Sequence, residues 1–328
     1  ALTDPSYRGQ ILAFTYPSQG NYGVPVLRVT AESGSSAQDV AGAPPARPWE
    51  SDRVQAAGVV CASYSEEYSH YSAAFSLGAW LTAQGIPAIT GVDTRALTKR
   101  IRMRGALLGR IEIEGQASPD FVDPNLRNLV GEVSTREVRR YGKGGTPILL
   151  IDCGKKNNQV RMLLERGAEV RVVPWDHDLR GQRRDYAGVV ISNGPGDPRL
   201  AGATVETARF LMRRRVPILG ICLGHQILAL AAGASTFKMK FGHRAHNQPC
   251  VETGAGRCYQ TSQNHGYAVD GKSLPDGWQE WFVNANDGTS EGIRHSRGPW
   301  RSVQFHPEAS PGPTGTEWIL DQFLAEIR

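Results

Sequence analysis

The second half of the chain alternates short apolar runs with helical patterns, and this alternation constrains the fold more than any other feature. The apolar runs lie at residues 148–152, 169–173, 189–192 and 218–221. Such runs are typical of strands buried on both faces of a parallel sheet. Helical patterns fall between them, for example at 158–166 and 205–214. The order predicts a doubly wound α/β sheet with right-handed crossovers.

The rest of the sequence indicates a second, smaller α/β domain. Glycine, proline and charged residues accumulate at 139–147, which predicts a domain boundary. We therefore expect an N-terminal domain at 1–141, a linker at 142–146 and the doubly wound domain at 147–328. Other expectations are a helix at 73–84, a Ser-, Gly-, Ala- and Pro-rich loop at 33–48, shorter strands after Gly233 and a C-terminal helix at 316–327.

Composition narrows the class of protein without identifying a reaction. No run of 18 apolar residues occurs, which argues against a membrane span. The five cysteines include no CxxC pair, which argues against a disulfide framework or a zinc site. The same usage favours a reducing compartment. We expect the cytoplasm, with the mitochondrion as the alternative. We expect no metal in this chain. The first residues lack the order of a signal peptide and begin abruptly, as a fragment of a longer chain would.

Two basic clusters, at 99–102 and 213–215, contain no interleaved aromatic residues. We interpret them as solvated helix faces rather than as a nucleic-acid surface. A basic patch that docks a partner subunit is the alternative.

Cys222 is the candidate nucleophile. It lies in Gly220-Ile221-Cys222-Leu223-Gly224, between an apolar run and a helical pattern that Gly233 would end. A sharp strand-to-helix turn would push the side chain into the open, and the helix N-terminus would favour the thiolate. The amide of Leu223 could bind a developing oxyanion. The alternative is a buried structural cysteine, the role that we expect for Cys153, Cys250 and Cys258.

His306 and Glu308 are the candidate base and its orienting carboxylate. Residues 301–308 read as a strand, and side chains two apart on a strand face the same side. A carboxylate on the far imidazole nitrogen would fix the tautomer and stabilise the imidazolium. A lone His-x-Glu pair is weak evidence and gains weight from Cys222. His225 suits packing better, and His243 and His246, in an apparent loop, could serve either role.

Three segments, in this order, resemble the class I (triad-type) glutamine amidotransferases: 192–198 (Ser-Asn-Gly-Pro-Gly-Asp-Pro), 220–226 (Gly-Ile-Cys-Leu-Gly-His-Gln) and 305–308 (Phe-His-Pro-Glu). Others, spread over nearly the whole chain, resemble the small subunit of carbamoyl-phosphate synthetase: 3–7 (Thr-Asp-Pro-Ser-Tyr), 20–23 (Gly-Asn-Tyr-Gly), 92–95 (Val-Asp-Thr-Arg), 238–242 (Lys-Met-Lys-Phe-Gly) and 262–267 (Ser-Gln-Asn-His-Gly-Tyr). Segments 174–177 and 284–288 are most similar to the eukaryotic form, which is often fused to its synthetase.

The resemblance implies a triad of Cys222, His306 and Glu308, with an oxyanion hole from the amides of Gly194 and Leu223. It also implies a set of glutamine contacts: Ser6, Gly194, Gly196, Leu223, Gln226, Asn264, Gly266 and Tyr267. Hydroxyl, amide and backbone groups of this kind suit the charged ends of glutamine. The Gly-Pro-Gly segment could equally be a tight turn, and both can hold, because a glycine turn lets backbone amides approach a ligand.

By this resemblance we expect hydrolysis of L-glutamine to glutamate and ammonia, which passes to a separate or fused synthetase that uses ATP, magnesium and bicarbonate. The chain itself has no ATP-binding pattern, so no cofactor is expected on it. The product would serve pyrimidine, arginine or urea synthesis. The alternatives are an amidotransferase that serves another acceptor and a catalytically silent regulatory scaffold. One branch of the family has serine in place of the nucleophile, whereas this chain keeps Cys222.

Two departures from the family pattern stand out. The family has additional residues before the Thr-Asp-Pro-Ser segment, so the first domain is expected to lack its start. The loop at 33–48 is longer than usual, as a surface insertion would be.

Overall fold

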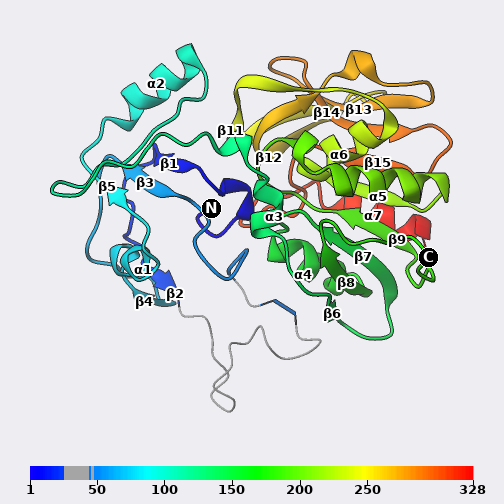
Figure 1. The fold of residues 1–328 in the computed structure, drawn as a ribbon, viewed down its shortest axis with the longest axis horizontal. Coiled ribbons are helices and arrows are strands. Elements are labelled where there is room, and N and C mark those ends of the chain that lie inside the picture. Colours follow the sequence, from blue (N-terminus) through cyan, green and yellow to red (C-terminus); the bar gives the residue numbers. More distant parts are fainter. Residues whose placement is uncertain (26–43, 46–47, 328) are drawn as a thin grey trace.

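The computed structural model describes residues 1–25, 44–45 and 48–327. It contains a small N-terminal unit and a larger C-terminal unit built on one ten-stranded sheet (Figure 1). The predicted loop at 33–48 lies outside the described residues except at positions 44, 45 and 48. Among the residues described, no helix is both long enough and apolar enough to cross a membrane.

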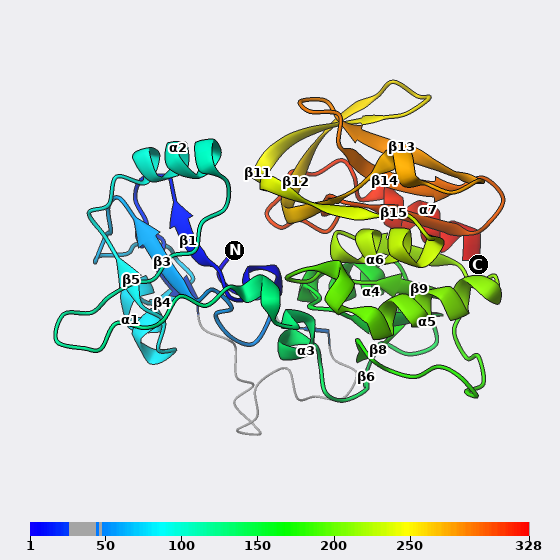
Figure 2. The same ribbon diagram turned by 45° about the horizontal axis from the view of Figure 1, so that its top comes forward.

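The N-terminal unit combines two small sheets with short helices. Its elements are η1 (Pro5–Tyr7), β1 (Ile11–Phe14), β2 (Val24–Pro25), β3 (Gly58–Cys61), β4 (Ala73–Phe75), α1 (Leu77–Ala83), β5 (Ala88–Ile89), α2 (Thr94–Arg104) and η2 (Pro124–Leu126). Strands β1, β3 and β5 form a parallel sheet, and β2 pairs antiparallel with β4. Figure 2 shows this unit beside the larger one, with α2 and α1 at its two ends.

The helix predicted at 73–84 begins later than expected. Residues Ala73–Phe75 form strand β4, and the helix starts after Ser76, whose hydroxyl accepts a hydrogen bond from the amide of Ala79. Serine is a preferred N-cap because it satisfies one of the free amides at a helix start. The first four residues of the predicted helix were therefore assigned wrongly.

The C-terminal unit follows the predicted alternation closely. Its elements are α3 (Leu129–Val133), β6 (Arg139–Tyr141), β7 (Thr146–Asp152), α4 (Asn157–Glu165), β8 (Ala168–Pro174), β9 (Gly188–Ile191), η3 (Pro198–Leu200), α5 (Gly202–Arg213), β10 (Ile218–Ile221), α6 (Leu223–Ala232), β11 (Thr236–Glu252), β12 (Cys258–Val269), η4 (Gly271–Ser273), β13 (Trp278–Asn284), β14 (Ser290–His295), β15 (Trp300–Val303) and α7 (Trp318–Ile327). The four predicted buried strands are β7 to β10, and Gly233 ends α6 in the left-handed conformation, as predicted.

The sheet runs in the order β12-β11-β13-β14-β15-β10-β9-β7-β8-β6, with β15, β10, β9, β7 and β8 parallel. Helices cover both of its faces. Ile148 and Leu150 of β7 lie in a core with α4 and α7, while Leu149 and Ile151 lie in another with α5 and α6. Alternate strand residues point to opposite faces, so the apolar run fills both cores. The doubly wound α/β prediction is confirmed.

The region after Gly233 differs from the prediction. Strand β11 has 17 residues and β12 has 12, so these strands are long rather than short. They form an antiparallel hairpin, and the β11 carbonyl of Lys240 accepts a hydrogen bond from Ala106, just after α2. The local sequence pattern did not predict this long hairpin, which also contacts the N-terminal unit.

The linker predicted at 142–146 remains a prediction. Strand β6, which immediately precedes it, pairs antiparallel with β8 at the edge of the large sheet. Val130 of α3 also packs in the core that contains α5 and α6. These two segments therefore lie on the larger unit.

Candidate active site

Cys222 stands at the turn from β10 into α6 with φ 54° and ψ −103°. Few residues other than glycine adopt positive φ, so this backbone is strained. The flanking glycines are required by close approach. A Cβ on Gly220 would lie 2.4 Å from the carbonyl oxygen of Gly224, and one on Gly224 would lie 2.0 Å from that of Ile191. The predicted elbow is present.

The thiol of Cys222 is covered rather than open. Its residue is only 2% exposed, and Sγ lies 3.8 Å from the backbone oxygen of Asn264 on β12. The prediction that the turn pushes this side chain into the open was wrong for this state, because the long strand β12 passes over the elbow. Glutamine could reach Sγ only if neighbouring groups move.

His306 and Glu308 meet directly, although not on a strand. Strand β15 ends at Val303, and the two residues follow in a turn. Nδ1 of His306 lies 2.7 Å from Oε1 of Glu308, and both side chains are buried. The predicted pairing is thus observed, but a turn that contains Pro307 produces it instead of strand alternation.

The other ring nitrogen of His306, Nε2, lacks a regular hydrogen-bond partner among the described residues. Burial and Lys156 lower the pKa of His306, whereas Glu308 and Cys222 raise it, and the balance is a rise. The thiol and the imidazole therefore interact. Cys222, His306 and Glu308 are thus neighbours, with His306 bonded to Glu308 and influenced by Cys222.

Lys156 is a buried positive charge beside Glu308 and His306. Its Nζ lies 3.3 Å from Oε1 of Glu308 and 3.9 Å from Oδ2 of Asp4. Burial alone would raise the pKa of Glu308, but Lys156 and His306 hold it well below its usual range. Burial likewise lowers the pKa of Lys156, yet Glu308 and Asp4 raise it overall. Each buried charge is stabilised by its neighbours.

The N-terminal unit reaches this site through its first residues. The hydroxyl of Ser6 accepts a hydrogen bond of 2.9 Å from Nδ2 of Asn193, next to Gly194. Oδ1 of Asn193 in turn accepts from Nε2 of Gln159, which also lies 3.3 Å from Oε1 of Glu308. Ser6 is therefore joined to the triad by two amide side chains.

The other predicted glutamine contacts lie around Cys222 to different degrees. Gly194 lies close to the side chain of Leu223, since a Cβ on Gly194 would lie 2.8 Å from Cδ2 of Leu223. Gln226 donates a hydrogen bond of 2.8 Å to the backbone oxygen of Tyr267. The side-chain nitrogen of Asn264, Nδ2, is buried without a hydrogen-bond partner in the described part of the chain.

Two predicted contacts have other nearest neighbours. A Cβ on Gly196 would face Leu129, and one on Gly266 would lie 3.2 Å from Nη2 of Arg244. The roles of all the predicted glutamine contacts remain predictions.

The remaining histidines and cysteines are now placed. His225 is fully buried and bonds Ser302, as expected for packing, and burial lowers its pKa to about 3. His243 and His246 lie on strand β11, not in a loop. Cys153 and Cys250 are buried as expected, whereas Cys258 is exposed where β12 begins, so its core assignment was wrong.

Both basic clusters carry exposed arginine or lysine side chains. The cluster at 99–102 lies on α2, as the interpretation of a solvated helix face requires, whereas α5 ends at Arg213, so Arg214 and Arg215 are solvated but lie past the helix.

Sequence reasoning gave no role to Lys156, Asn193 or Gln159. One signal could have found Lys156. It follows the carboxyl end of β7, and ligands of open α/β sheets bind outside the carboxyl ends of the strands. Asn193 and Gln159 carry no comparable signal, because ordinary amide side chains gain meaning only from their neighbours.

Two families match the chain. Residues 149–326 match the family described as Glutamine amidotransferase class-I, and residues 1–111 match Carbamoyl-phosphate synthase small chain, CPSase domain. Among solved structures, a glutamine amidotransferase of Thermotoga maritima is 20% identical with a TM-score of 0.43, covering 56% of this chain and 84% of that one.

Curated relatives match along the whole chain. The multifunctional protein ura1 of Schizosaccharomyces pombe is 48% identical over 360 residues, covering 100% of this chain and 16% of ura1. The mitochondrial carbamoyl-phosphate synthase (ammonia) of Rattus norvegicus is 47% identical over 331 residues, covering 100% of this chain and 21% of the relative. The chain therefore spans about a fifth or less of the length of these relatives.

Proposed function

The chain belongs to the class I glutamine amidotransferases, and we propose that it is the glutamine-hydrolysing component of a carbamoyl-phosphate synthase. The observation that carries the proposal is the buried chain of Cys222, His306 and Glu308, in which Nδ1 of His306 lies 2.7 Å from Oε1 of Glu308. The match of residues 1–111 to the small-chain domain supports carbamoyl-phosphate synthesis, rather than another acceptor, as the use of the ammonia.

In the proposed reaction His306 already holds the thiol proton as an imidazolium, and Sγ of Cys222 attacks the side-chain amide carbon of glutamine. The amides of Gly194 and Leu223 would hold the oxyanion. The C–N bond breaks as His306 returns the proton to the nitrogen, which leaves ammonia and a thioester. Water, deprotonated by His306, then hydrolyses the thioester to glutamate and restores the thiol. Glu308 holds Nδ1 of the ring throughout.

We further propose that the ammonia passes to a synthetase region that binds ATP, magnesium and bicarbonate, either fused to this chain or separate. The cytoplasm is the proposed compartment. The name of the Rattus norvegicus relative makes the mitochondrion the alternative.

A glutaminase assay tests the proposal. The chain, with its synthetase partner, should release glutamate from glutamine, and Cys222→Ala should abolish the release while leaving far-UV circular dichroism unchanged. The name of the Rattus norvegicus relative gives ammonia as its nitrogen source, so a silent scaffold is the second candidate. No glutamate release by the parent would favour the scaffold, and release by Cys222→Ala equal to that of the parent would show that Cys222 is not the nucleophile.

A further inference from the structure

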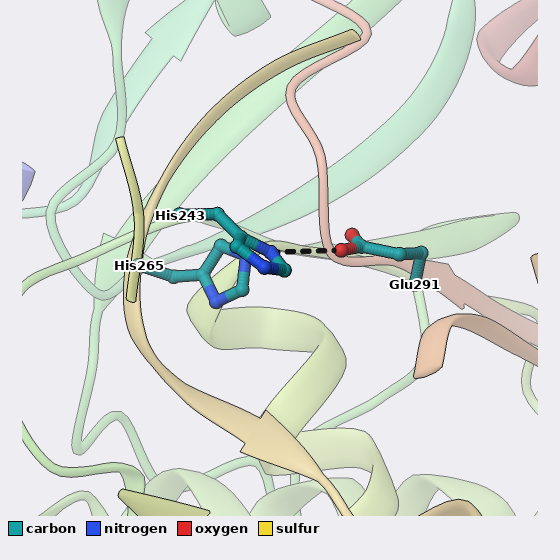
Figure 3. Close-up of side chains that lie close together, drawn as sticks. All are labelled: His243, His265 and Glu291. Atoms are coloured by element: carbon teal, nitrogen blue, oxygen red, sulfur yellow. Dashed lines mark hydrogen bonds and ion pairs between the residues drawn. The ribbon is translucent and has the colours of Figure 1, made fainter. Parts of the chain in front are cut away.

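Three ligand-type side chains outside the triad converge in the antiparallel part of the large sheet. They are His243 of β11, His265 of β12 and Glu291 of β14, which point toward one another in Figure 3. One potential ligand atom from each lies within 4.8 Å of the others, and all three residues are buried. His243 and His265 are cross-strand partners, so the sheet itself sets their spacing.

Further side chains hold this group from outside. Nδ1 of His243 lies 3.1 Å from Oε1 of Glu291, and its Nε2 lies 2.9 Å from Oδ2 of Asp287. Asn284 donates a hydrogen bond of 3.0 Å to Oε1 of Glu291. Ligating histidines usually donate their second N–H to a carboxylate or a carbonyl, which fixes the ring. Asp287 stands where such an orienting carboxylate would stand.

Protein groups alone do not satisfy this cluster. Oε2 of Glu291 has no hydrogen-bond partner within the described residues, although the residue is fully buried. His265 faces oxygen on both sides, with the carbonyl of Tyr267 2.8 Å from Nδ1 and Oε1 of Gln263 3.0 Å from Nε2. A neutral imidazole has one N–H and one nitrogen with a lone pair, so the lone pair of His265 faces an oxygen instead of a donor. A buried polar group without a partner is costly, and a cation would relieve both defects.

We propose that His243, His265 and Glu291 bind one divalent cation of the zinc class, with water as the fourth ligand. Two imidazole nitrogens and one carboxylate suit zinc, whereas magnesium and calcium prefer sites made of oxygen. Tetrahedral ligands at zinc distances lie about 3.4 Å apart, so small side-chain rotations bring these atoms into range. The ion takes the place of the Nδ1 proton of His243, while its Nε2–H stays on Asp287.

We expected no metal from the sequence because the cysteines are not spaced as zinc ligands. The ligands here are spread over three strands, which only the fold brings together. Metal binding at this cluster does not depend on glutamine hydrolysis, so it can be tested apart from the proposed function.

The test is titration of the full chain, freed of metal by a chelator, with Zn²⁺ in a calorimeter and with Co²⁺ in a spectrophotometer. The parent should bind one equivalent of each, with tetrahedral Co²⁺ absorption, and should not bind Mg²⁺. His243→Asn and Glu291→Gln should weaken Zn²⁺ binding more than tenfold. Asp287→Asn, at a partly exposed carboxylate, should weaken it by about 10- to 100-fold without removing a ligand. His246→Asn, on the same strand but outside the cluster, is the matched control and should bind as the parent does.

The Co²⁺ spectrum separates this site from binding by thiols, since thiolate ligation adds a sulfur-to-metal charge-transfer band. That band, lost in Cys222→Ala, would place the ion on Cys222 and overturn the proposal. Absence of binding, or equal affinity in Asp287→Asn and the parent, would overturn it as well. Circular dichroism of each variant shows whether it folds. If a variant at a buried residue does not fold, the Zn²⁺ affinity of Asp287→Asn decides the question.

Discussion

Nζ of Lys156 lies 3.3 Å from Oε1 of Glu308, the carboxylate that also contacts His306, and both side chains are buried. The same ammonium group faces Asp4 of the N-terminal unit at 3.9 Å. The charge on the orienting carboxylate is therefore balanced by a cation that also contacts the first residues of the chain. Through this pair the N-terminal unit can influence the electrostatics of the triad.

Lys156→Met should affect both stability and pH dependence. Removing one partner of a buried ion pair costs about 3–5 kcal/mol of unfolding free energy, because the other charge is left behind. Lys156 also lowers the pKa of His306, so its loss should shift the alkaline limb of the kcat/KM profile, where the imidazolium loses its proton, to higher pH. Denaturant unfolding and pH-rate profiles measure the two effects. Lys155→Met is the control, since Nζ of Lys155 contacts Asn157 instead. Identical behaviour of the two variants would refute this coupling.

Replacing Cys222 should reveal the backbone strain of the elbow. At φ 54° a glycine is relaxed and an alanine is not, and such strain costs about 1–3 kcal/mol. We expect Cys222→Gly to unfold at higher denaturant concentration than Cys222→Ala, while both lack glutaminase activity. Greater stability of the alanine variant would contradict the strained geometry.

Gly194→Ala should damage the proposed oxyanion hole. The new Cβ would lie 2.1 Å from the carbonyl oxygen of Cys153, so the backbone must move. Loss of one oxyanion donor typically lowers kcat by about 10²–10³. Gly202→Ala is the matched control, because its Cβ would meet nothing within 4 Å. Steady-state glutaminase kinetics decide, and equal kcat values for the two variants would count against a donor at residue 194.

Ser6→Ala tests whether the N-terminal unit contributes to the glutamine site. It removes the acceptor of the 2.9 Å hydrogen bond from Asn193. A hydrogen bond is worth about 0.5–1.5 kcal/mol, so we expect the KM for glutamine to rise by up to about tenfold with a smaller change in kcat. The control is Ser72→Ala, at an exposed serine. If KM stays at the parent value, Ser6 has no part in binding.

The stability of the fold should depend on pH through His306. Burial and Lys156 lower the pKa of this residue, but Glu308 and Cys222 raise it from 6.5 to about 10. The folded state therefore holds this proton more tightly than the unfolded chain. The resulting stability is fully present below pH 6.5 and is lost as the pH rises toward 10.

The unfolding free energy of the parent, minus that of His306→Asn, should thus decrease as the pH rises from 6 to 9.5. The lowered pKa of Glu308 matters only in the acid range, so it does not disturb this comparison. Urea titrations at several pH values measure the difference. A difference that stays constant or grows with pH would show that His306 is not held as an imidazolium.

Much of the C-terminal unit could be predicted because its signals are local. The apolar runs of β7, β9 and β10 are buried on both faces, and Gly233 ends α6 by its own backbone preference. The hairpin of β11 and β12 was harder to predict. Its residues alternate irregularly, with register shifts between the paired strands, and the hairpin contacts the N-terminal unit.

The sequence by itself determined the alternation of strands and helices in the C-terminal unit, the glycine-flanked turn at Cys222 and the pairing of His306 with Glu308, since each depends on residues close together in the chain. Only the tertiary structure decided that β12 covers the thiol, that Lys156 neutralises Glu308 and that His243, His265 and Glu291 meet. The physical reason is that burial and charge pairing arise between segments far apart in the sequence. The strength of a charge depends on what the fold places around it.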